Sequence, residues 1–101
     1  GTQSAAGETI DDIICSKPWP CEEALRVVYG PTLACPTGES NGNPLAVSWD
    51  GSSYGLFQVA WVHAERCPGF WEHWWEPAWN TDCAWEIYRE TWSWEAWDCQ
   101  P

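Results

Sequence analysis

The spacing of apolar residues in the first third of the chain predicts two short helices. Thr9 is placed to cap the first helix, in which three isoleucines share one face: Ile10, Ile13 and Ile14. Residues 15–21 contain two prolines and are expected to form a loop. The second helix is expected to start near Cys21, to end at Gly30, and to bury Leu25, Val28 and Tyr29. Residues 1–7 are small and polar and are expected to fray.

The middle of the chain has the pattern of loops and short strands. Residues 38–53 are rich in Gly, Asn, Ser and Pro, and a strand is predicted over residues 54–59. A helix is predicted over residues 60–66, where Cys67-Pro-Gly ends it. Beyond this point, an aromatic helical face is expected from Phe70, Trp71, Trp74 and Trp75.

One long helix is predicted near the C-terminus. Asn80 is expected to cap it, and its inner face is expected to consist of Ala84, Ile87, Tyr88 and Thr91. The sequence contains no internal repeat and no linker, so residues 1–101 are expected to form a single domain. The predicted fold class is α+β, mostly α, with a short β region.

Six cysteines in 101 residues indicate three disulfides, a framework typical of secreted domains. Zinc binding is the alternative, but the sequence contains no Cys-x-x-Cys pair. The sequence alone does not choose among the possible pairings. The pairing we favour joins Cys15 to Cys21, Cys67 to Cys83, and Cys35 to Cys99. Because the chain contains no Met, we expect a processed protein without its leader. The cysteine content predicts an extracellular location.

The charge of the chain limits its partners. Lys and Arg number 4 against 15 Asp and Glu, which gives a formal net charge of -11. This charge repels phosphate backbones, so no nucleic acid is expected as a partner. No apolar run approaches the roughly 18 residues of a membrane span, so no membrane partner is expected either. We expect no cofactor and no metal ion, and we expect a monomer.

The chain contains eleven tryptophans, most of them between Trp71 and Trp97. We expect most of them to serve the core, where each ring N–H needs an acceptor. The functional interpretation is a partly open aromatic cleft, since flat apolar faces rimmed by hydroxyls and carboxylates are suited to stacking on sugar rings. The composition therefore favours a protein that binds or cleaves carbohydrate.

The candidate chemistry centres on Glu39, a carboxylic acid in a loop-rich stretch between a polar β region and a Trp-rich helical half. Cleavage of a glycosidic bond needs an acid that stays protonated near neutral pH, so that it can give its proton to the leaving oxygen. Apolar surroundings raise the pKa of a carboxyl group, and the aromatic residues of this chain are suited to supply them.

The residues that follow Glu39 carry a recognisable order of motifs. Glu39-Ser40, Asn43-Pro44 and Ala46-Val47-Ser48 are followed by Gly55-Leu56-Phe57-Gln58, and later by Ile87-Tyr88 and Trp92-Ser-Trp94. In these motifs the chain resembles the lysozyme-like superfamily, specifically the soluble lytic transglycosylase and goose-type lysozyme branch. The resemblance covers roughly residues 21–97 and implies a small lysozyme-like fold.

By position, the resemblance implies that Glu39 is the general acid. Four further residues would line or orient the site: Ser48, Tyr54, Gln58 and Tyr88. Ser48 and Gln58 would hold the substrate or the catalytic carboxyl by hydrogen bonds, and Tyr54 would border the sugar cleft. Tyr88 would orient Glu39 from the last helix, or serve as a core aromatic residue. His63 lies where small members of the family carry a His, and we expect a structural role for it.

A second carboxylate decides the type of reaction. An inverting hydrolase uses a base about 6.5–9.5 Å from the acid to activate water. Asp50 is the candidate, because it lies close to the position of such an Asp in the goose-type enzymes, and it equally suits a turn. Without a base, the resemblance implies attack by the muramyl 6-hydroxyl, which is the lytic transglycosylase reaction.

The chain departs from the family in the segment before the acid. In the family the catalytic Glu directly follows a helix, whereas residues 30–38 separate Glu39 from the predicted helix. Pro36 and Gly38 are poor residues for a helix interior, so we expect Glu39 on an extension held by a disulfide.

Three functions follow as hypotheses. The resemblance implies a muramidase, a glycosidase that cleaves the β-1,4 bond between N-acetylmuramic acid and N-acetylglucosamine in peptidoglycan. The expected partner is peptidoglycan or a chitooligosaccharide-like glycan. The alternative is a non-catalytic, Trp-rich carbohydrate-binding module. A third hypothesis, an acidic inhibitor of a basic partner, explains the net charge and none of the motifs.

Overall fold

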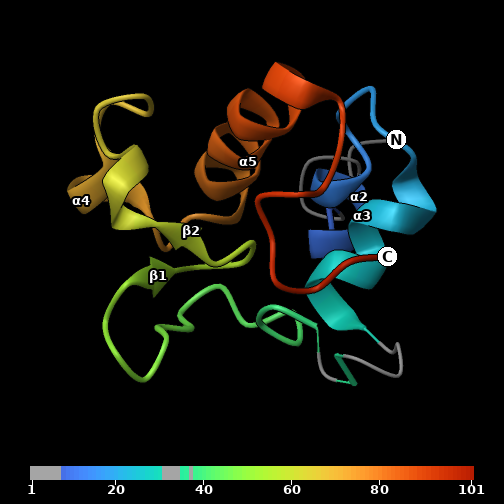
Figure 1. Ribbon diagram of the computed structural model, residues 1–101, viewed down its shortest axis with the longest axis horizontal. Helices are drawn as coiled ribbons and strands as arrows, with labels where there is room; N and C mark the ends of the chain where they lie inside the picture. The colour runs from blue at the N-terminus through green and yellow to red at the C-terminus, as the bar shows by residue number, and fades with distance from the viewer. Residues whose placement is uncertain (1–7, 31–34, 37) are drawn as a thin grey trace.

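The computed structural model describes residues 8–30, 35–36 and 38–101. Its helices and strands there are α2 (Ile10–Ile14), α3 (Cys21–Tyr29), β1 (Ser53–Tyr54), β2 (Val59–Ala60), α4 (Phe70–His73) and α5 (Pro77–Thr91). Figure 1 shows α5 in the middle, with β1, β2 and α4 on one side of it and α2 and α3 on the other. The predicted α+β class, mostly α, is confirmed. The predicted fraying of residues 1–7 lies outside the described residues.

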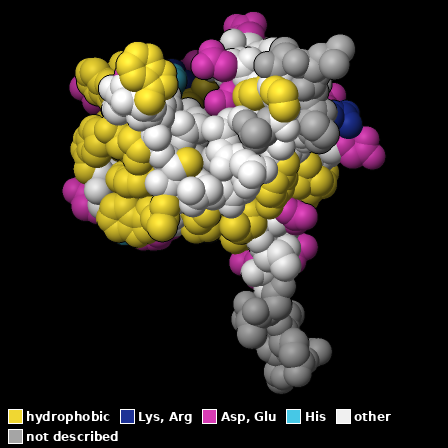
Figure 2. Space-filling view, turned by 90° about the horizontal axis from the view of Figure 1, so that it is seen from below, with side chains coloured by type: hydrophobic (Ala, Val, Ile, Leu, Met, Phe, Trp, Pro, Cys, Tyr) yellow, Lys and Arg dark blue, Asp and Glu magenta, His cyan; other side chains and the backbone are white. Residues whose placement is uncertain are grey.

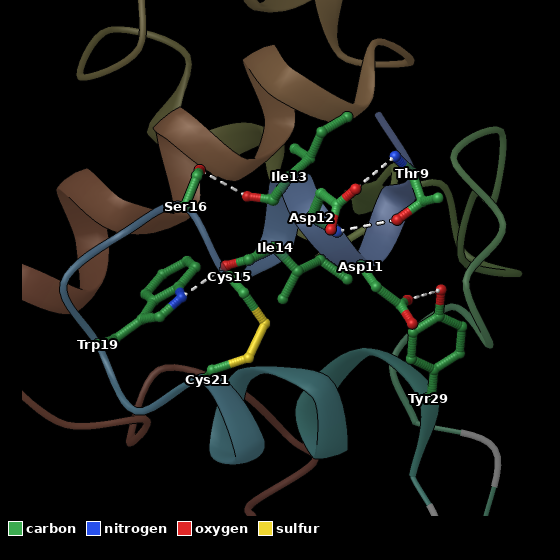
Figure 3. The surroundings of a disulfide bond; sticks show 10 residues. All are labelled: Thr9, Asp11, Asp12, Ile13, Ile14, Cys15, Ser16, Trp19, Cys21 and Tyr29. Atoms are coloured by element: carbon green, nitrogen blue, oxygen red, sulfur yellow. Dashed lines mark hydrogen bonds between the residues drawn. A yellow bond between two sulfur atoms is a disulfide. The ribbon is translucent and has the colours of Figure 1, made fainter. Parts of the chain in front are cut away.

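The first two predicted helices are confirmed (Figure 3). The Asp12 N–H donates to the Thr9 hydroxyl at 3.1 Å, and the Asp12 carboxylate accepts the Thr9 N–H, so a capping box begins α2. The buried face of α3 differs from the prediction, since it consists of Ala24, Val27 and Val28. Leu25 and Tyr29 are only half-buried. α3 has five apolar or aromatic residues after its first turn begins, and only the three that face its packing neighbours are fully buried.

β1 and β2 form a two-stranded antiparallel sheet, in which Ser53 pairs with Ala60 and Tyr54 with Val59. An isolated bridge between Val47 and Tyr54 attaches the preceding segment to its edge. The β region is therefore short, as expected, and depends on the helices for its support.

The single strand predicted over residues 54–59 is wrong, because the chain reverses within it. Gly55 and Gln58 have φ angles of 82° and 50°, and the turn between the strands is built on them. Leu56 and Phe57 lie in this turn and are fully buried. The apolar residues Leu56 and Phe57 thus form the buried tip of a hairpin. A buried tip and a strand have the same apolar pattern in the sequence, so the sequence alone does not separate them.

The two helices predicted between this hairpin and α5 are shorter than expected. Residues 60–66 contain only the 3-10 turn Trp61–His63 (η1), and α4 has four residues. The expected common face of aromatic residues is wrong in part, since Phe70 is buried whereas Trp71 and Trp75 are exposed. Proline and glycine residues interrupt this part of the chain, so no long helix forms.

α5 begins at Pro77, earlier than predicted, and Asn80 does not cap it. Asn80 is fully buried within the helix, where its side chain reaches the hairpin. Its Oδ1 accepts the Phe57 N–H at 2.7 Å, and its Nδ2 donates to the carbonyl oxygens of Tyr54 at 3.0 Å and Trp74 at 3.1 Å. The local sequence resembles that of a helix N-cap. In the structure Asn80 instead satisfies three backbone groups outside α5.

The inner face of α5 is otherwise close to the prediction. Ala84, Ile87 and Tyr88 are buried, whereas Thr91 is exposed at the end of the helix. With 15 residues, α5 is the longest helix among the described residues, and none of these helices is long and apolar enough to cross a membrane.

All six cysteines are paired, so none is available as a zinc ligand. The disulfides are Cys15–Cys21, Cys35–Cys99 and Cys67–Cys83, which is the favoured pairing. The first joins the end of α2 to the start of α3, as Figure 3 shows. The second spans 64 residues and fixes the C-terminal segment, which descends past the sheet toward α3 in Figure 1.

The tryptophans divide between the core and the surface. Three are buried, and each ring N–H has an acceptor: Trp19 donates to the Ile14 carbonyl, Trp94 to the Glu23 carboxylate and Trp97 to the Phe57 carbonyl. The half-buried ones are Trp74, Trp79 and Trp85. The exposed ones are Trp49, Trp61, Trp71, Trp75 and Trp92. The half-buried ones pack against the core, so six of the eleven tryptophans serve it and the expectation holds by a small majority.

Candidate functional site

Glu39 lies at the C-terminal end of α3, although nine residues separate it from that helix in the sequence. Its backbone N–H donates to the Val27 carbonyl at 2.7 Å. The Asn41 N–H donates to the Val28 carbonyl at 3.0 Å, and the Ser40 hydroxyl donates to the Leu56 carbonyl of the hairpin at 2.6 Å. The chain thus returns to the last turn of α3 and satisfies carbonyl groups that a helix end leaves free.

Two glycines permit this return. Gly30 ends α3 with a φ of 75°, and Gly38 precedes the acid with a φ of 68°. A Cβ atom on Gly38 would lie 2.2 Å from the Val28 carbonyl oxygen, which is closer than any real contact. Gly30 and Gly38 therefore lie close together at the end of α3, and Glu39 lies beside the last turn of that helix.

The Glu39 side chain lines a pocket of about 220 Å³ between the hairpin, α5 and the C-terminal segment. The hairpin and η1 contribute Ser53, Gln58, Val59, Ala60 and His63. Ile87 of α5 and residues 96–98 complete the wall. Four segments of the chain meet here, and their meeting point holds two carboxyl groups, a carboxamide and an imidazole.

The surroundings of Glu39 favour its protonated form. Burial is the largest influence and raises the pKa of Glu39 above its ordinary value. The Cys99 N–H, which donates to Glu39 Oε2 at 2.8 Å, stabilises the ionised form and opposes this shift. The nearby charge of Asp98 raises the pKa further, and the Asp98 N–H lowers it. The net effect is a carboxyl group that retains its proton to higher pH than an exposed glutamate does.

Gln58 lines the same pocket as Glu39. Its Nε2 donates to the carbonyl oxygens of Ala46 at 2.9 Å and Gly55 at 3.0 Å, so both amide hydrogens hold the hairpin together. Among the described residues no donor contacts its Oε1 atom, which is therefore the group that Gln58 can offer to a ligand.

Ser48 and Asp50 lie together in the turn before β1, and neither is among the residues that line the pocket. The carboxylate of Asp50 accepts hydrogen bonds from the Ser48 hydroxyl at 2.7 Å and from the Ser52 hydroxyl at 2.8 Å. These hydroxyls, the Ser48 group above all, lower the pKa of Asp50. These hydrogen bonds stabilise the turn. The role of Ser48 in binding substrate and that of Asp50 as second carboxylate stay predictions.

Tyr54 and Tyr88 both lie among aromatic rings. Tyr54 contacts the rings of Phe70, Trp71 and Trp74 with centroid distances of 5.2–5.7 Å. Tyr88 is buried against Trp19, Trp85, Trp92 and Trp94. Burial, followed by the charge of Glu23, raises the pKa of Tyr88. Tyr88 is not among the residues lining the Glu39 pocket, so the geometry favours the core interpretation of this residue.

Two residues of the pocket were missed by sequence reasoning. His63 was expected to be structural, yet it lines the pocket, where burial and then the charge of Arg66 lower its pKa. Asp98 lies beside the last cysteine and has no motif around it. The only signal for Asp98 was the favoured Cys35–Cys99 disulfide, which brings the C-terminus to the segment before Glu39.

A second hollow of about 440 Å³ lies on another side of α5. Lys17 and Arg66 line it, together with Asp82, Glu86 and the rings of Trp79 and Trp85. Lys17 forms an ion pair with Asp82, and Arg66 forms one with Glu90. Its cations are thus already neutralised, and none of the residues predicted for the site lies in it.

Hydrophobic side chains gather on the part of the surface that contains the hairpin and α4 (Figure 2). The exposed residues of this region include Trp49, Trp61, Trp71 and Trp75, and Trp49 is 99% exposed at the turn before β1. Such a concentration of exposed rings is typical of a surface that contacts a ligand or partner.

No family model, no curated protein and no solved structure matches the chain. Within the described residues there is also no group of three or more His, Cys, Asp and Glu side chains arranged to hold a metal ion. The function must therefore be argued from the geometry of the site.

Proposed function

We propose that this protein is a secreted peptidoglycan-cleaving glycosidase, in which Glu39 is the general acid. One observation carries the proposal: the carboxyl group of Glu39 is partly buried in a pocket, and its pKa is raised by that burial. A carboxylic acid that keeps its proton is what the leaving oxygen of a glycosidic bond requires.

The position of Glu39 supports the resemblance to the lysozyme-like superfamily. In that family the acid directly follows a helix, and here the backbone of Glu39 is hydrogen-bonded to the last turn of α3. The motif Gly55-Leu56-Phe57-Gln58 forms the hairpin turn, and its Gln58 faces the same pocket. The motif that contains Glu39 and the motif that contains Gln58 therefore meet at one pocket, and this proximity supports the resemblance.

In the proposed reaction Glu39 donates its proton to the glycosidic oxygen between N-acetylmuramic acid and N-acetylglucosamine. The bond from the sugar carbon to that oxygen then breaks, and positive charge develops on the sugar ring. Gln58 would accept a hydrogen bond from the sugar through its Oε1 atom. The reaction is completed either by water, which gives a reducing sugar, or by the muramyl 6-hydroxyl, which gives an anhydro-sugar.

The test is digestion of purified peptidoglycan with the wild type and with Glu39→Gln, followed by mass spectrometry of the products. Gln has nearly the same shape and can still accept the Cys99 N–H, but it has no proton to donate. We expect a loss of about 100-fold to 10,000-fold in turnover. Glu95→Gln is the matched control, because it removes an exposed carboxylate outside the pocket. Turnover by Glu39→Gln equal to that of the wild type contradicts the proposal.

A second candidate is a carbohydrate-binding module without catalysis, and the exposed tryptophans around the hairpin favour it. Titration with chitooligosaccharides, followed by tryptophan fluorescence, separates the two. A bound glycan with no product from the wild type at any pH supports the binding module. Products that depend on Glu39 support the enzyme.

A further inference from the structure

The C-terminal segment carries a carboxylate to the Glu39 pocket. After α5 the chain passes through the buried residues Trp94 and Trp97 to the buried Cys99, which is bonded to Cys35. Asp98 lies between Trp97 and Cys99 but is itself exposed, and it lines the pocket. Its neighbours on both sides are anchored in the core, so the backbone that carries Asp98 is held in place.

Among the described residues that line this pocket, Asp98 and Glu39 are the only carboxylates. The Cys99 N–H reaches Glu39 Oε2 at 2.8 Å, so the residue after Asp98 is in direct contact with the acid. Asp50, by contrast, lies outside the pocket, and its carboxylate accepts two serine hydroxyls and the Ser52 N–H. All three hydrogen bonds fall on Oδ1, so what separates Asp50 from the site is its position outside the pocket that Glu39 lines.

We propose that Asp98 is the second carboxylate of the site and activates the attacking water. This inference rests on the proposed glycosidase function and decides between its two possible outcomes. It selects hydrolysis, because a base that delivers water makes attack by the muramyl hydroxyl unnecessary.

The proton balance of the step is complete. Asp98 takes one proton from water, and the water oxygen forms a bond to the sugar carbon from the face opposite the leaving group. The bond from that carbon to the glycosidic oxygen breaks, and the oxygen receives the proton of Glu39. Asp98 ends protonated and Glu39 ionised, and exchange of one proton with solvent restores both. No oxidant, metal or cofactor enters the step.

The two roles fit the two environments. Asp98 is exposed to solvent and lines the pocket, so water can reach its carboxylate. Glu39 is more buried, and the negative charge of Asp98 helps to keep it protonated. Two carboxyl groups whose surroundings differ in this way are typical of an acid and base pair.

The experiment compares Asp98→Asn with the wild type on purified peptidoglycan. We expect turnover to fall about 100-fold or more, while binding of a chitooligosaccharide, followed by tryptophan fluorescence, changes by less than about twofold. We expect the wild type to give reducing ends whose anomeric configuration, measured by NMR immediately after cleavage, is inverted. Asp82→Asn is the matched control, because Asp82 is exposed on α5 and outside the pocket.

The outcomes separate this inference from the proposed function. If the wild type cleaves and depends on Glu39, but Asp98→Asn keeps wild-type turnover, the inference fails and the glycosidase function stands. Anhydro ends from the wild type, a retained configuration, or a large loss in Asp50→Asn with none in Asp98→Asn also overturn it. If the wild type gives no product, the proposed function fails, and the role of Asp98 fails with it.

Discussion

The backbone N–H of Cys99 donates a hydrogen bond of 2.8 Å to the carboxylate of Glu39, across 60 residues of sequence. Cys99 is also bonded to Cys35, which lies four residues before Glu39. The acid is therefore held from two directions, by the last turn of α3 beneath its backbone and by the C-terminal segment at its side chain. This arrangement makes the Cys35–Cys99 disulfide part of the site as well as part of the framework.

Replacing Cys35 and Cys99 together by serine is expected to cost about 4 kcal/mol of stability, because this disulfide closes a loop of 64 residues. The matched control replaces Cys15 and Cys21, whose separation is 6 residues, and should cost about 2 kcal/mol. Urea unfolding at 25 °C measures both values.

The same pair of variants tests the link to the site. At a temperature where both remain folded, we expect the variant without Cys35 and Cys99 to lose turnover on peptidoglycan, and the control to keep it. An equal loss in the two variants would mean that the C-terminal segment does not position Glu39.

Gly38→Ala is expected to displace Glu39. The new Cβ would meet the Val28 carbonyl oxygen at 2.2 Å, in a backbone conformation with a φ of 68°. We expect a loss of about 3 kcal/mol in stability, and a loss of about 100-fold in turnover from a small shift of the acid. Gly51→Ala is the control, because Gly51 has a φ of 73° but its nearest neighbour is 4.0 Å away. It should cost only about 1 kcal/mol.

Asn80→Ala is expected to loosen the hairpin from α5. The buried carboxamide satisfies three backbone groups, so its removal should cost about 3 kcal/mol in urea unfolding. The neighbouring Thr81 is equally buried, but within the described residues its hydroxyl has no hydrogen-bond partner. Thr81→Val should therefore leave the stability unchanged or raise it by about 1 kcal/mol. A similar loss in both variants would contradict this account.

The raised pKa of Glu39 makes stability depend on pH. Because the folded state holds this proton more tightly than the unfolded state, the group favours folding most below its ordinary pKa of 4.5. That contribution declines as the pH rises through the interval up to the raised pKa. Thermal unfolding should show Glu39→Gln more stable than the wild type at pH 7, with a smaller difference at pH 4. A difference that grows toward acid pH would show that the pKa of Glu39 is lowered instead.

The net charge of -11 is expected to oppose binding to anionic cell walls. Turnover of peptidoglycan should rise between 0.1 M and 1 M NaCl, since the screening length falls from about 10 Å to about 3 Å. Cleavage of an uncharged chitooligosaccharide over the same range is the control and should change little. Faster digestion of the wall at low salt would contradict the expectation.

The sequence by itself determined the elements whose signals are local. The isoleucine spacing after Thr9 predicted α2 and its cap, and the glycine at position 30 predicted the end of α3. Cysteine content predicted the disulfide framework, and the order of motifs singled out Glu39 and Gln58, which share one pocket. The cap of α2 and the end of α3 depend on backbone geometry between near neighbours. The disulfide framework follows from cysteine content, and Glu39 and Gln58 follow from the resemblance.

The tertiary structure decided everything that depends on contacts between distant segments. Residues 54–59 read as a strand, but Asn80 and Trp97 bind the backbone of this segment as a buried turn. Asn80 was predicted to be an N-cap because its hydrogen-bond partners in the hairpin, Phe57 and Tyr54, lie 23 and 26 residues away and have no local signal. Asp98 carried no local signal, because only the Cys35–Cys99 disulfide brings the segment that contains it to the Glu39 pocket. The pattern of one segment cannot contain this information, because the free energy that selects these conformations comes from burial and hydrogen bonds with other segments.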